Sequence, residues 1–358
     1  MTKIAILGAG RWGVHLIRNF LEHPLSELIA VIDPQPERLT AVRQRLHLPK
    51  EVMLATDGSV LQDLPELEAV AIATPASTHY PLIVTALQQG YHVFTEKPLT
   101  LNLLEAREVC QLADKQQRQL FVDHTYLFHP AIERGKTAIQ AGQLGTLRYG
   151  YAQRTHLEPV RWDVDALWDL AIHDIAIFNT WLGEVPSQVQ ATGTAFRHNL
   201  QPQDPELATI SPFPFYDLVW ATLTYPSGFQ AFIHLCWLNP DKQRRLTLVG
   251  SQAALVFDEL SGHTPLTLHH PYREGGGDRN PELTSSAPWK VATSYQEVLA
   301  IEPSEPLRRV CDHFLNCLQK NCPSPLSSGW ASVELIRILS ALSESLKLGG
   351  KTISLEQP

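Results

Sequence analysis

The sequence predicts an α/β Rossmann domain with a parallel sheet, followed by an α+β domain with a large, mostly antiparallel open sheet. From residue 2 to about residue 122, short β-branched runs alternate with helical stretches, which is the rhythm of parallel strands joined by crossover helices. After about residue 145 the strands become longer and alternate between apolar and polar residues. That alternation is typical of an antiparallel sheet with one buried face.

Length favours two domains. The chain has 358 residues, 44% of them hydrophobic and 18% charged, which is enough apolar sequence to bury a large core. We predict that residues 1–123 form the Rossmann domain. Residues 124–358 form the second domain, whose final helix can pack back on the first.

Composition excludes several classes of protein. The 29 Lys and Arg residues against 37 Asp and Glu residues give a formal net charge of −8, without long single-sign runs, which disfavours a nucleic-acid surface. The five cysteines contain no C-x-x-C pair and fit reduced thiols in a cytosolic protein, with no zinc site. No run approaches 18 apolar residues, and the amino terminus resembles a first strand and not a secretory signal, so we expect a cytoplasmic protein without a membrane span.

The first domain can be read strand by strand. Its expected strands are KIAILG, LIAVID, AVAIAT and HVFTE, at residues 3–8, 28–33, 69–74 and 92–96. Between the first two lies a helix over residues 12–22, in which Gly13, Leu16, Ile17, Phe20 and Leu21 recur at helical spacing. This spacing places one apolar face of the helix against the sheet and leaves the start of the helix free for a ligand.

The second domain contains both element types. Residues 229–238 alternate strictly and predict a half-buried strand, while helices are expected over residues 166–181, 307–318 and 332–348. Residues 197–214 and 261–306 are rich in Pro, Gly, Asn and Ser and lack periodicity. We therefore interpret them as long surface excursions, the second with room for short strands.

A glycine motif follows the first strand. Gly8 to Gly13 fit G-x-G-x-x-G between a strand and an amphipathic helix. In that setting the glycines allow a tight turn, a close approach of backbone N–H groups to a pyrophosphate, and close packing of helix and strand. A purely structural glycine turn is the alternative.

Asp33 strengthens the interpretation as a dinucleotide site. It lies 20 residues beyond Gly13, at the end of the second strand, where a carboxylate can accept hydrogen bonds from adenosine ribose hydroxyls. A carboxylate there repels a 2′-phosphate and so favours NAD over NADP, although Arg38 can soften that preference. A solvated strand-end residue is the other interpretation of Asp33.

Two further strand ends complete the expected cofactor edge. Thr74 and Pro75 follow the strand over residues 69–74, where open α/β sheets bind ligands, although Thr74 is equally readable as a turn or cap residue. Glu96, Lys97 and Pro98 follow the next strand. The proline stiffens the backbone before it and aims the Lys97 ammonium, which suits a developing oxyanion, whereas an isolated Glu-Lys-Pro is as readily a surface ion pair.

A carboxylate and an imidazole lie one helical turn apart in the second domain. Asp169 and His173 are four residues apart in a segment with helical apolar spacing, so their side chains share one face. Removal of a hydride from an alcohol carbon also requires loss of the hydroxyl proton, and an imidazole is well suited to accept it near neutral pH. Without context, such a pair is more often a plain hydrogen bond at a core edge.

These motifs together resemble the Gfo/Idh/MocA family of NAD(P)-dependent oxidoreductases. The resemblance runs nearly the whole chain and is carried by GAGRWG at residues 8–13, TEKPL at 95–99, WDLAIHD at 168–174, and the later blocks WLNPDKQRRLTLVG and EPLRRVCDHF. Ile172 stands where a proline is common in relatives. Within the family the chain looks most like the nucleotide-sugar branch of UDP-N-acetylglucosamine 3-dehydrogenase-like proteins.

The resemblance implies a sugar dehydrogenase. It implies that Lys97 contacts the reacting oxygen, that Asp169 binds substrate and that His173 is the general base, with Asp174 as the neighbour most easily confused with them. His124 and Arg154 are weaker candidates for substrate contact. The residues expected at the cofactor are Gly8, Gly10, Arg11, Trp12, Gly13, Asp33, Thr74, Pro75, Glu96 and Lys97.

Other expectations remain open. Lys242, Arg244 and Arg245 can pair with a diphosphate or form a solvated face, and the histidines show no metal-ligand spacing, so no metal is expected. The family commonly packs the open sheet against a second copy, which predicts a homodimer or homotetramer. Two other functions stay possible: a catalytically silent sensor of NAD or sugar, and a reductase of a non-sugar substrate such as the biliverdin reductases.

Overall fold

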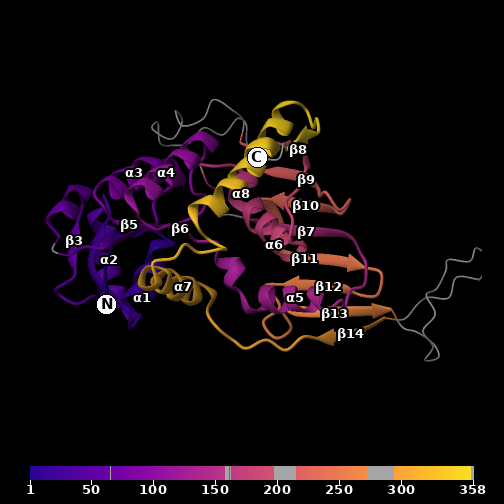
Figure 1. Ribbon diagram of the computed structural model, residues 1–358, viewed down its shortest axis with the longest axis horizontal. Coiled ribbons are helices and arrows are strands. Elements are labelled where there is room, and N and C mark those ends of the chain that lie inside the picture. Colours follow the sequence, from indigo (N-terminus) through magenta and orange to yellow (C-terminus); the bar gives the residue numbers. More distant parts are fainter. Residues whose placement is uncertain (65, 158–160, 162, 197–214, 272–293, 356–358) are drawn as a thin grey trace, which may run out of the picture.

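Two sheets of different type form the molecule (Figure 1). The structure is a computed structural model, which describes residues 1–64, 66–157, 161, 163–196, 215–271 and 294–355. In the described chain the first sheet has six strands and the second has nine. The predicted fold class is confirmed in both parts.

The first sheet is parallel throughout, with the order β3-β2-β1-β4-β5-β6. Its strands are β1 (Thr2–Leu7), β2 (Ser26–Ile32), β3 (Met53–Ala55), β4 (Ala69–Ile72), β5 (His92–Thr95) and β6 (Leu120–Val122). Helices α1 (Gly13–Glu22), α2 (Pro36–Leu46), α3 (His79–Gln88) and α4 (Leu103–Gln116) connect them. The strand order reverses between β1 and β4, and ligands of such sheets bind at the carboxyl ends of the strands beside that reversal.

Apolar runs explain why these strands lie at the centre. Every residue of β4 is buried, as expected for a parallel strand covered on both faces. Helix α1 buries Leu16, Ile17 and Phe20, the face that its spacing predicted. The start of α1 is thereby held against the end of β1.

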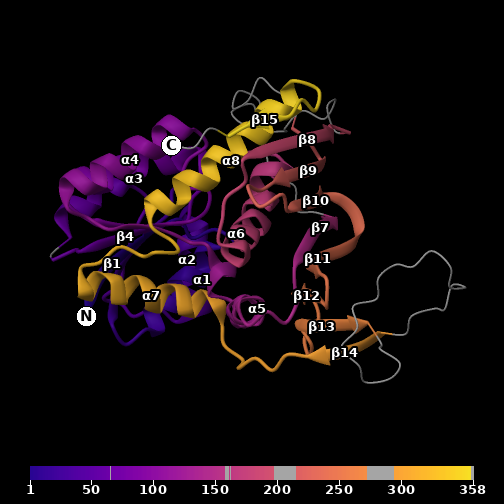
Figure 2. The same ribbon diagram turned by 45° about the vertical axis from the view of Figure 1, so that its right-hand side comes forward.

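Two carboxyl-terminal helices also cover the first sheet. In α7 (Pro306–Lys320), the Phe314 ring packs against the rings of Phe20 and Phe94 at 6.3 and 5.4 Å between centroids. Figure 2 shows α7 beside α1. Helix α8 (Gly329–Lys347) places Val333 in the core of the first sheet and Leu339 in that of the second. The division after residue 123 therefore stays a prediction, because the chain returns to the first sheet.

The second sheet has the order β14-β13-β12-β11-β7-β10-β9-β8-β15. Its strands are β7 (Leu147–Leu157), β8 (Gln188–Thr194), β9 (Leu218–Thr224), β10 (Gln230–Cys236), β11 (Leu238–Gly250), β12 (Ala254–Asp258), β13 (Leu266–Pro271), β14 (Ser294–Val298) and β15 (Ile353–Ser354). Neighbours pair antiparallel except β7 and β10, which are parallel. The strict alternation of β10 matches the predicted half-buried strand.

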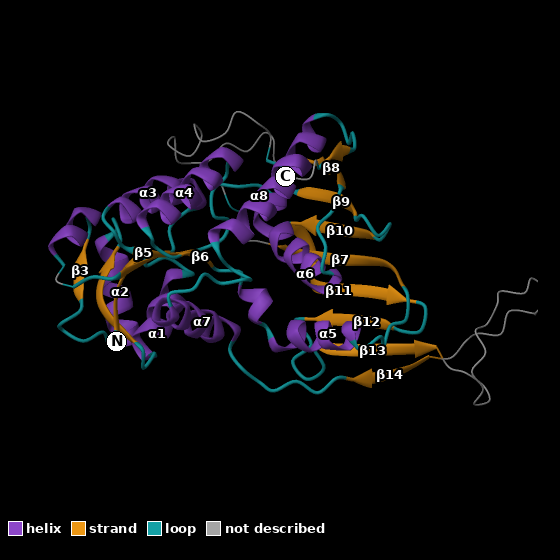
Figure 3. Ribbon diagram, viewed as in Figure 1, coloured by secondary structure: helices purple, strands orange, loops and turns teal. Residues whose placement is uncertain are grey.

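Helices cover the face of this sheet that is turned toward the first sheet, as Figure 3 shows for α5 (Pro130–Gln140), α6 (Ile172–Leu182) and α8. One turn of π-helix, η4 (Leu167–Ala171), precedes α6, so the predicted helix over residues 166–181 is present but opens irregularly. The opposite face carries four exposed aromatic side chains, those of Tyr149, Tyr151, Trp220 and Phe232.

The two predicted excursions are described only in part. Residues 197–214 and 272–293 lie outside the described residues, while β13 and β14 supply short strands within the excursion over residues 261–306. None of the helices in the described ranges is long and apolar enough to cross a membrane. All five cysteines are free.

Candidate active site

The glycine turn after β1 is shaped for a close ligand. Gly8 has a φ of +100°, and a Cβ there would lie 2.6 Å from the carbonyl oxygen of Ala73. A Cβ at Gly13 would lie 2.1 Å from the carbonyl oxygen of Gly8, so neither position accepts a side chain. At Gly10 a Cβ would meet only the Arg38 guanidinium, at 3.7 Å, which leaves open space above the turn. These features fit a dinucleotide pyrophosphate at the start of α1.

Asp33 lies buried at the end of β2 and joins the glycine turn. Its Oδ2 accepts a hydrogen bond from the backbone N–H of Ala9 at 2.8 Å, and its Oδ1 accepts one from Gln35 at 2.9 Å. Arg38, with 47% of its side chain exposed, approaches Oδ2 at 3.6 Å. The carboxylate thus has a structural role in the turn and also stands at the expected ribose position. Arg11 and Trp12 are exposed on the turn itself.

Thr74 and Pro75 follow β4 directly beside the glycine turn. The backbone nitrogen of Thr74 is 3.1 Å from the position of a Cβ at Gly8, and the Thr74 hydroxyl accepts a hydrogen bond from that of Thr78 at 2.7 Å. The buried His79 ring contacts the carbonyl oxygens of Thr74 and Pro98, at 3.1 and 2.7 Å. His79 therefore ties the loop after β4 to the loop after β5.

Glu96 and Asp123 form a carboxyl pair at the ends of the neighbouring strands β5 and β6. Burial raises the pKa of Asp123 to about 6, although Thr125 donates a hydrogen bond to its Oδ1 at 2.6 Å. Burial and the nearby Asp123 raise the pKa of Glu96 well above its ordinary value, because two buried carboxyl groups side by side disfavour two negative charges. Each carboxyl has one buried oxygen without a partner among the described residues. Sequence reasoning did not find Asp123.

Lys97 and Asp169 meet although 72 residues separate them. The Lys97 ammonium donates to the backbone oxygen of Asp169 at 2.8 Å and to its Oδ1 at 3.1 Å. Each side chain is only 15% exposed. Burial alone would raise the pKa of Asp169, but Lys97 and Arg161 outweigh it and lower the pKa below its ordinary value. Asp169 therefore stays ionised.

His173 lies one helical turn beyond Asp169 and is neutral. Burial lowers its pKa well below 6.5, and the cations of Lys97, Arg154 and Arg244 lower it further. Its ring stacks at a tilt on that of Tyr126, with 4.7 Å between centroids. A buried neutral imidazole beside an ammonium can accept a proton from a hydroxyl group. The structure therefore brings together the three side chains that the sequence singled out.

Arg154 and His124 are buried near Lys97 and His173. The Arg154 guanidinium forms a buried two-point pair with Asp174, in which Nε donates to Oδ2 at 3.1 Å and Nη2 to Oδ1 at 2.8 Å. His124 contacts the Ser332 hydroxyl at 2.8 Å, and burial followed by the charge of Lys97 lowers its pKa to about 4. Both are engaged with protein partners, and their contact with substrate stays a prediction.

An arginine that sequence reasoning missed joins the two domains. Arg161 donates from Nη1 to Asp169 Oδ1 at 3.0 Å and from Nη2 to Asp163 Oδ2 at 2.6 Å. That Asp163 oxygen also accepts the backbone N–H of Ala76 at 3.0 Å, in the loop after β4. The chain of contacts thus runs from the cofactor side to Lys97. Neither residue belongs to a motif that marks it in the sequence.

Three more residues, Tyr126, Glu259 and His156, line the site and were not predicted there. The Tyr126 hydroxyl accepts hydrogen bonds from Arg154 and Arg244, at 2.8 and 2.9 Å, and donates one to Glu259. His156 is buried on β7, and its Nδ1 has no partner among the described residues. Within the described ranges, no three His, Cys, Asp or Glu residues are grouped to hold a metal ion.

Both parts of the chain match a known protein family. Residues 2–124 match the model of an oxidoreductase family with an NAD-binding Rossmann fold, and residues 132–256 match the GFO/IDH/MocA C-terminal domain. The chain is similar to the UDP-N-acetylglucosamine 3-dehydrogenase of Acidithiobacillus ferrooxidans, with 32% identity over 54% of this chain and 58% of that relative. It is also similar to the scyllo-inositol 2-dehydrogenase (NAD(+)) of Bacillus subtilis, with 31% identity over 54% of this chain and 57% of that relative.

A solved structure extends the likeness over both domains. The aldose-aldose oxidoreductase from Caulobacter crescentus, crystallised with glycerol, superposes with a TM-score of 0.78 at 20% identity and covers 99% of each chain. At that identity the likeness shows the fold alone, whereas the two family models together match more than half of the chain. The chain belongs to the Gfo/Idh/MocA family of oxidoreductases.

Proposed function

We propose that the protein is an NAD-dependent dehydrogenase that oxidises a ring hydroxyl of a sugar or nucleotide sugar. The observation that carries this proposal is the meeting of the Lys97–Asp169 ion pair and the neutral His173 beside the edge of the first sheet. Oxidation of an alcohol needs a group that takes a proton and a group that steadies the oxygen, and these side chains meet both needs.

Each of the three side chains has a separate task. His173 takes the hydroxyl proton, because burial and neighbouring cations keep its ring neutral. Lys97 donates to the reacting oxygen as negative charge develops there. Among the described residues, the contacts to the Asp169 side chain go to Oδ1, which leaves Oδ2 to accept a hydrogen bond from a second substrate hydroxyl.

The glycine turn and Asp33 bind the cofactor. When bound, the dinucleotide supplies the hydride acceptor. The open space at Gly10 accepts its pyrophosphate, and Asp33 accepts hydrogen bonds from the adenosine ribose. Because a buried carboxylate repels a 2′-phosphate, we expect NAD and not NADP, although Arg38 stands close enough to Asp33 to reduce the difference.

Two relatives support the substrate class. One is named for UDP-N-acetylglucosamine and the other for scyllo-inositol, both rings that carry several hydroxyl groups. We include His124 and Arg154, which lie near Lys97 and His173, among the proposed substrate contacts, and the unpartnered Nδ1 of His156 offers a further hydrogen bond. The conversion therefore needs a cyclic polyol with a hydroxyl beside the reacting one.

We further propose that two copies pair through the outer face of the second sheet. This proposal is supported by the exposed aromatic side chains on β7, β9 and β10, since contiguous exposed apolar surface commonly marks an interface. A homodimer, or a homotetramer built from it, would cover that face. The cytoplasmic location stays a prediction.

The test is a coupled measurement of turnover and cofactor binding. Free sugars, nucleotide-linked sugars and cyclitols are supplied with NAD⁺ and, separately, NADP⁺, and the absorbance of reduced nicotinamide is followed. For the best substrate, His173→Ala should lower turnover about 10²- to 10⁴-fold while NAD affinity, measured by titration calorimetry, persists.

The matched control is His263→Ala, because His263 is exposed in the loop before β13 and contacts no proposed site residue through a hydrogen bond or ion pair among the described residues. It should leave turnover and affinity unchanged. Unchanged turnover in His173→Ala would remove that residue from the mechanism. If no member of the panel is oxidised although NAD binds, the protein is a sensor and not a dehydrogenase.

A further inference from the structure

Eight charged side chains near His173 form ion pairs with one another. We call them the balanced shell: it consists of four cations, Lys97, Arg161, Arg154 and Arg244, and four carboxylates, Asp163, Asp169, Asp174 and Glu259. Every member contacts a member of opposite charge. The formal charge of the shell is therefore zero.

Half of the shell lies on the side of Lys97. There the Asp169 carboxylate accepts from Lys97 at 3.1 Å and from Arg161 at 3.0 Å, and Arg161 also pairs with Asp163 at 2.6 Å. The two cations are thus matched by two carboxylates. Neither cation is left without a carboxylate partner.

The other half lies on the side of Tyr126. Arg154 pairs with Asp174 at 2.8 Å, both almost fully buried, and lies 3.8 Å from Glu259. Arg244 pairs with Glu259 at 3.4 Å. Again two cations meet two carboxylates, and the Tyr126 hydroxyl joins both arginines to Glu259.

The buried titratable groups near the shell add no positive charge. Burial lowers the pKa of His173, His124 and His156, so their rings are neutral near pH 7. Glu96 and Asp123 lie close enough to Lys97 to feel its charge, and whatever charge this pair carries is negative. The buried part of the site therefore has no unmatched cation with which to receive an anion.

We infer that the substrate ring that reaches His173 is uncharged and carries hydroxyl groups but no carboxylate or phosphate of its own. This inference rests on the proposed function and narrows its substrate class. A carboxylate that leaves water for this site would lose its hydration and find every cation already paired. A neutral hydroxyl exchanges its hydrogen bonds to water for bonds to Asp169, Lys97 and His173.

An anionic part of a larger substrate then has to stay at the rim. Lys242 at the start of β11 is exposed and has no carboxylate within ion-pair distance among the described residues. Lys242 lies near enough to His156 for its charge to lower the pKa of that ring. A diphosphate beside Lys242 is compatible with a neutral ring inside.

The experiment compares substrates that differ only in one charged group. The pairs are UDP-N-acetylglucosamine with its uronate, and glucose with glucuronate, in which a CH₂OH group is replaced by COO⁻. We expect kcat/KM of the wild-type enzyme to favour the neutral member about 100-fold or more. Uronates that are turned over as well as their neutral counterparts would overturn the inference while leaving the dehydrogenase function intact.

Two variants each remove one negative charge from the balanced shell. Glu259→Gln keeps an acceptor for the Tyr126 hydroxyl but leaves Arg244 without its carboxylate, and Asp163→Asn does the same for Arg161. Either should reduce the preference for the neutral member about tenfold, through a lower KM for the uronate. An unchanged preference in both folded variants contradicts the inference, and Asp163→Asn serves if Glu259→Gln does not fold.

The control carries the same change of charge elsewhere. Glu51→Gln lies on the exposed segment before β3, and its preference should equal that of the wild type. If no sugar is oxidised, the proposed function fails, and titration calorimetry of the same pairs still decides the inference. Tighter binding of the neutral member supports it, and equal or tighter binding of the uronate overturns it.

Discussion

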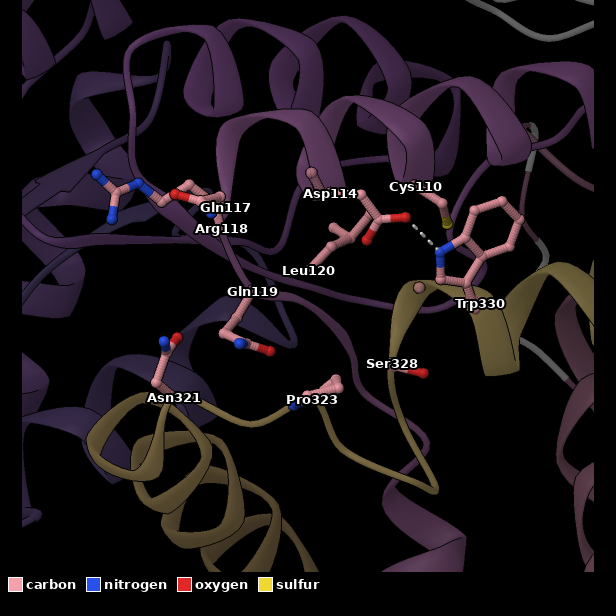
Figure 4. A pocket seen from close by; sticks show the side chains of 12 residues that line it. Cys110, Asp114, Gln117, Arg118, Gln119, Leu120, Asn321, Pro323, Ser328 and Trp330 are labelled. Carbon is pink, nitrogen blue, oxygen red and sulfur yellow. Dashed lines mark hydrogen bonds between the residues drawn. The ribbon is translucent and has the colours of Figure 1, made fainter.

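Polar side chains are buried at the carboxyl edge of the first sheet and exposed to water at its amino edge. At the carboxyl edge, Asp33, Glu96 and Asp123 have buried carboxyl oxygens, two of them without partners among the described residues. At the amino edge lies a hollow of about 240 Å³, lined among others by Arg118 and Trp330 (Figure 4). The charged groups of that hollow are exposed to water.

A hollow of this size does not by itself mark a reactive site in this fold. The amino-edge hollow is roomy, but among its labelled side chains Figure 4 marks a single hydrogen bond, from the Trp330 indole to Asp114 at 2.9 Å. At the carboxyl edge, burial shifts the pKa of several groups, and cations form ion pairs with carboxylates. Such desolvated, shifted groups are costly to keep, and they concentrate at functional sites.

Removing one cation from each edge gives the sharpest contrast. Lys97→Met should lower kcat about 10²- to 10³-fold, since it removes the donor that steadies the reacting oxygen. Arg118→Met, the same loss of charge at the amino edge, should change kcat less than about twofold because Arg118 is exposed. The measurement is steady-state turnover of the best substrate with NAD⁺.

Both variants should stay folded, because Asp169 keeps Arg161 as a partner when Lys97 is lost. Circular dichroism and thermal unfolding check this point. A large loss of turnover in Arg118→Met would assign a functional role to the hollow. Equal, small effects of the two changes would remove Lys97 from the chemistry.

The pH dependence of kcat/KM tests the electrostatic half of the comparison. His173 acts as a base only when neutral, and burial together with Lys97, Arg154, Arg244 and His124 lowers its pKa well below 6.5. As the pH falls, activity should therefore persist below pH 6.5 and decline only in more acid solution. An acid limb at the ordinary histidine value would contradict the assignment.

One variant should move the acid limb of the pH dependence of kcat/KM in a known direction. Arg244→Met removes a cation that lowers the pKa of His173, so the limb should shift to higher pH, whereas Arg118→Met should leave it in place. Asp123, with a pKa of about 6, titrates in the same range. Asp123→Asn therefore has to be measured beside them, and a limb that disappears in it belongs to the carboxyl pair.

The sequence predicted most of the fold because periodicity survives wherever an element is long. The alternation of β10 and the apolar face of α1 both appeared where expected. Strands β3 and β6 were missed, since three residues are too few to show a period. The packing of Phe314 against Phe20 joins the two ends of the chain, and no local pattern reports such a contact.

The residues of the candidate site were likewise predicted only in part. Motifs with fixed spacing, such as the glycine turn and the Asp169–His173 pair, could be found because their geometry is local. Arg161 and Asp123 could not, because their positions depend on how one domain rests on the other and on which strands are neighbours. The π-helical turn at Asp169 also escaped, since helical spacing alone does not distinguish it from an α-helical start.

Trp330→Phe is the mildest test of the comparison. It keeps an aromatic ring in the hollow and removes only the indole hydrogen bond to Asp114. Because Trp330 is 46% exposed and Asp114 is exposed as well, water can replace that bond, so the free energy of unfolding should fall by only about 0.5 kcal/mol in urea titration. Turnover, cofactor affinity and the preference between neutral and carboxylate sugars should stay at wild-type values. Helix α8 packs on both sheets. A change in any of these three properties, with so small a loss of stability, would mean that α8 couples the hollow to His173. The two edges could then no longer be treated as independent.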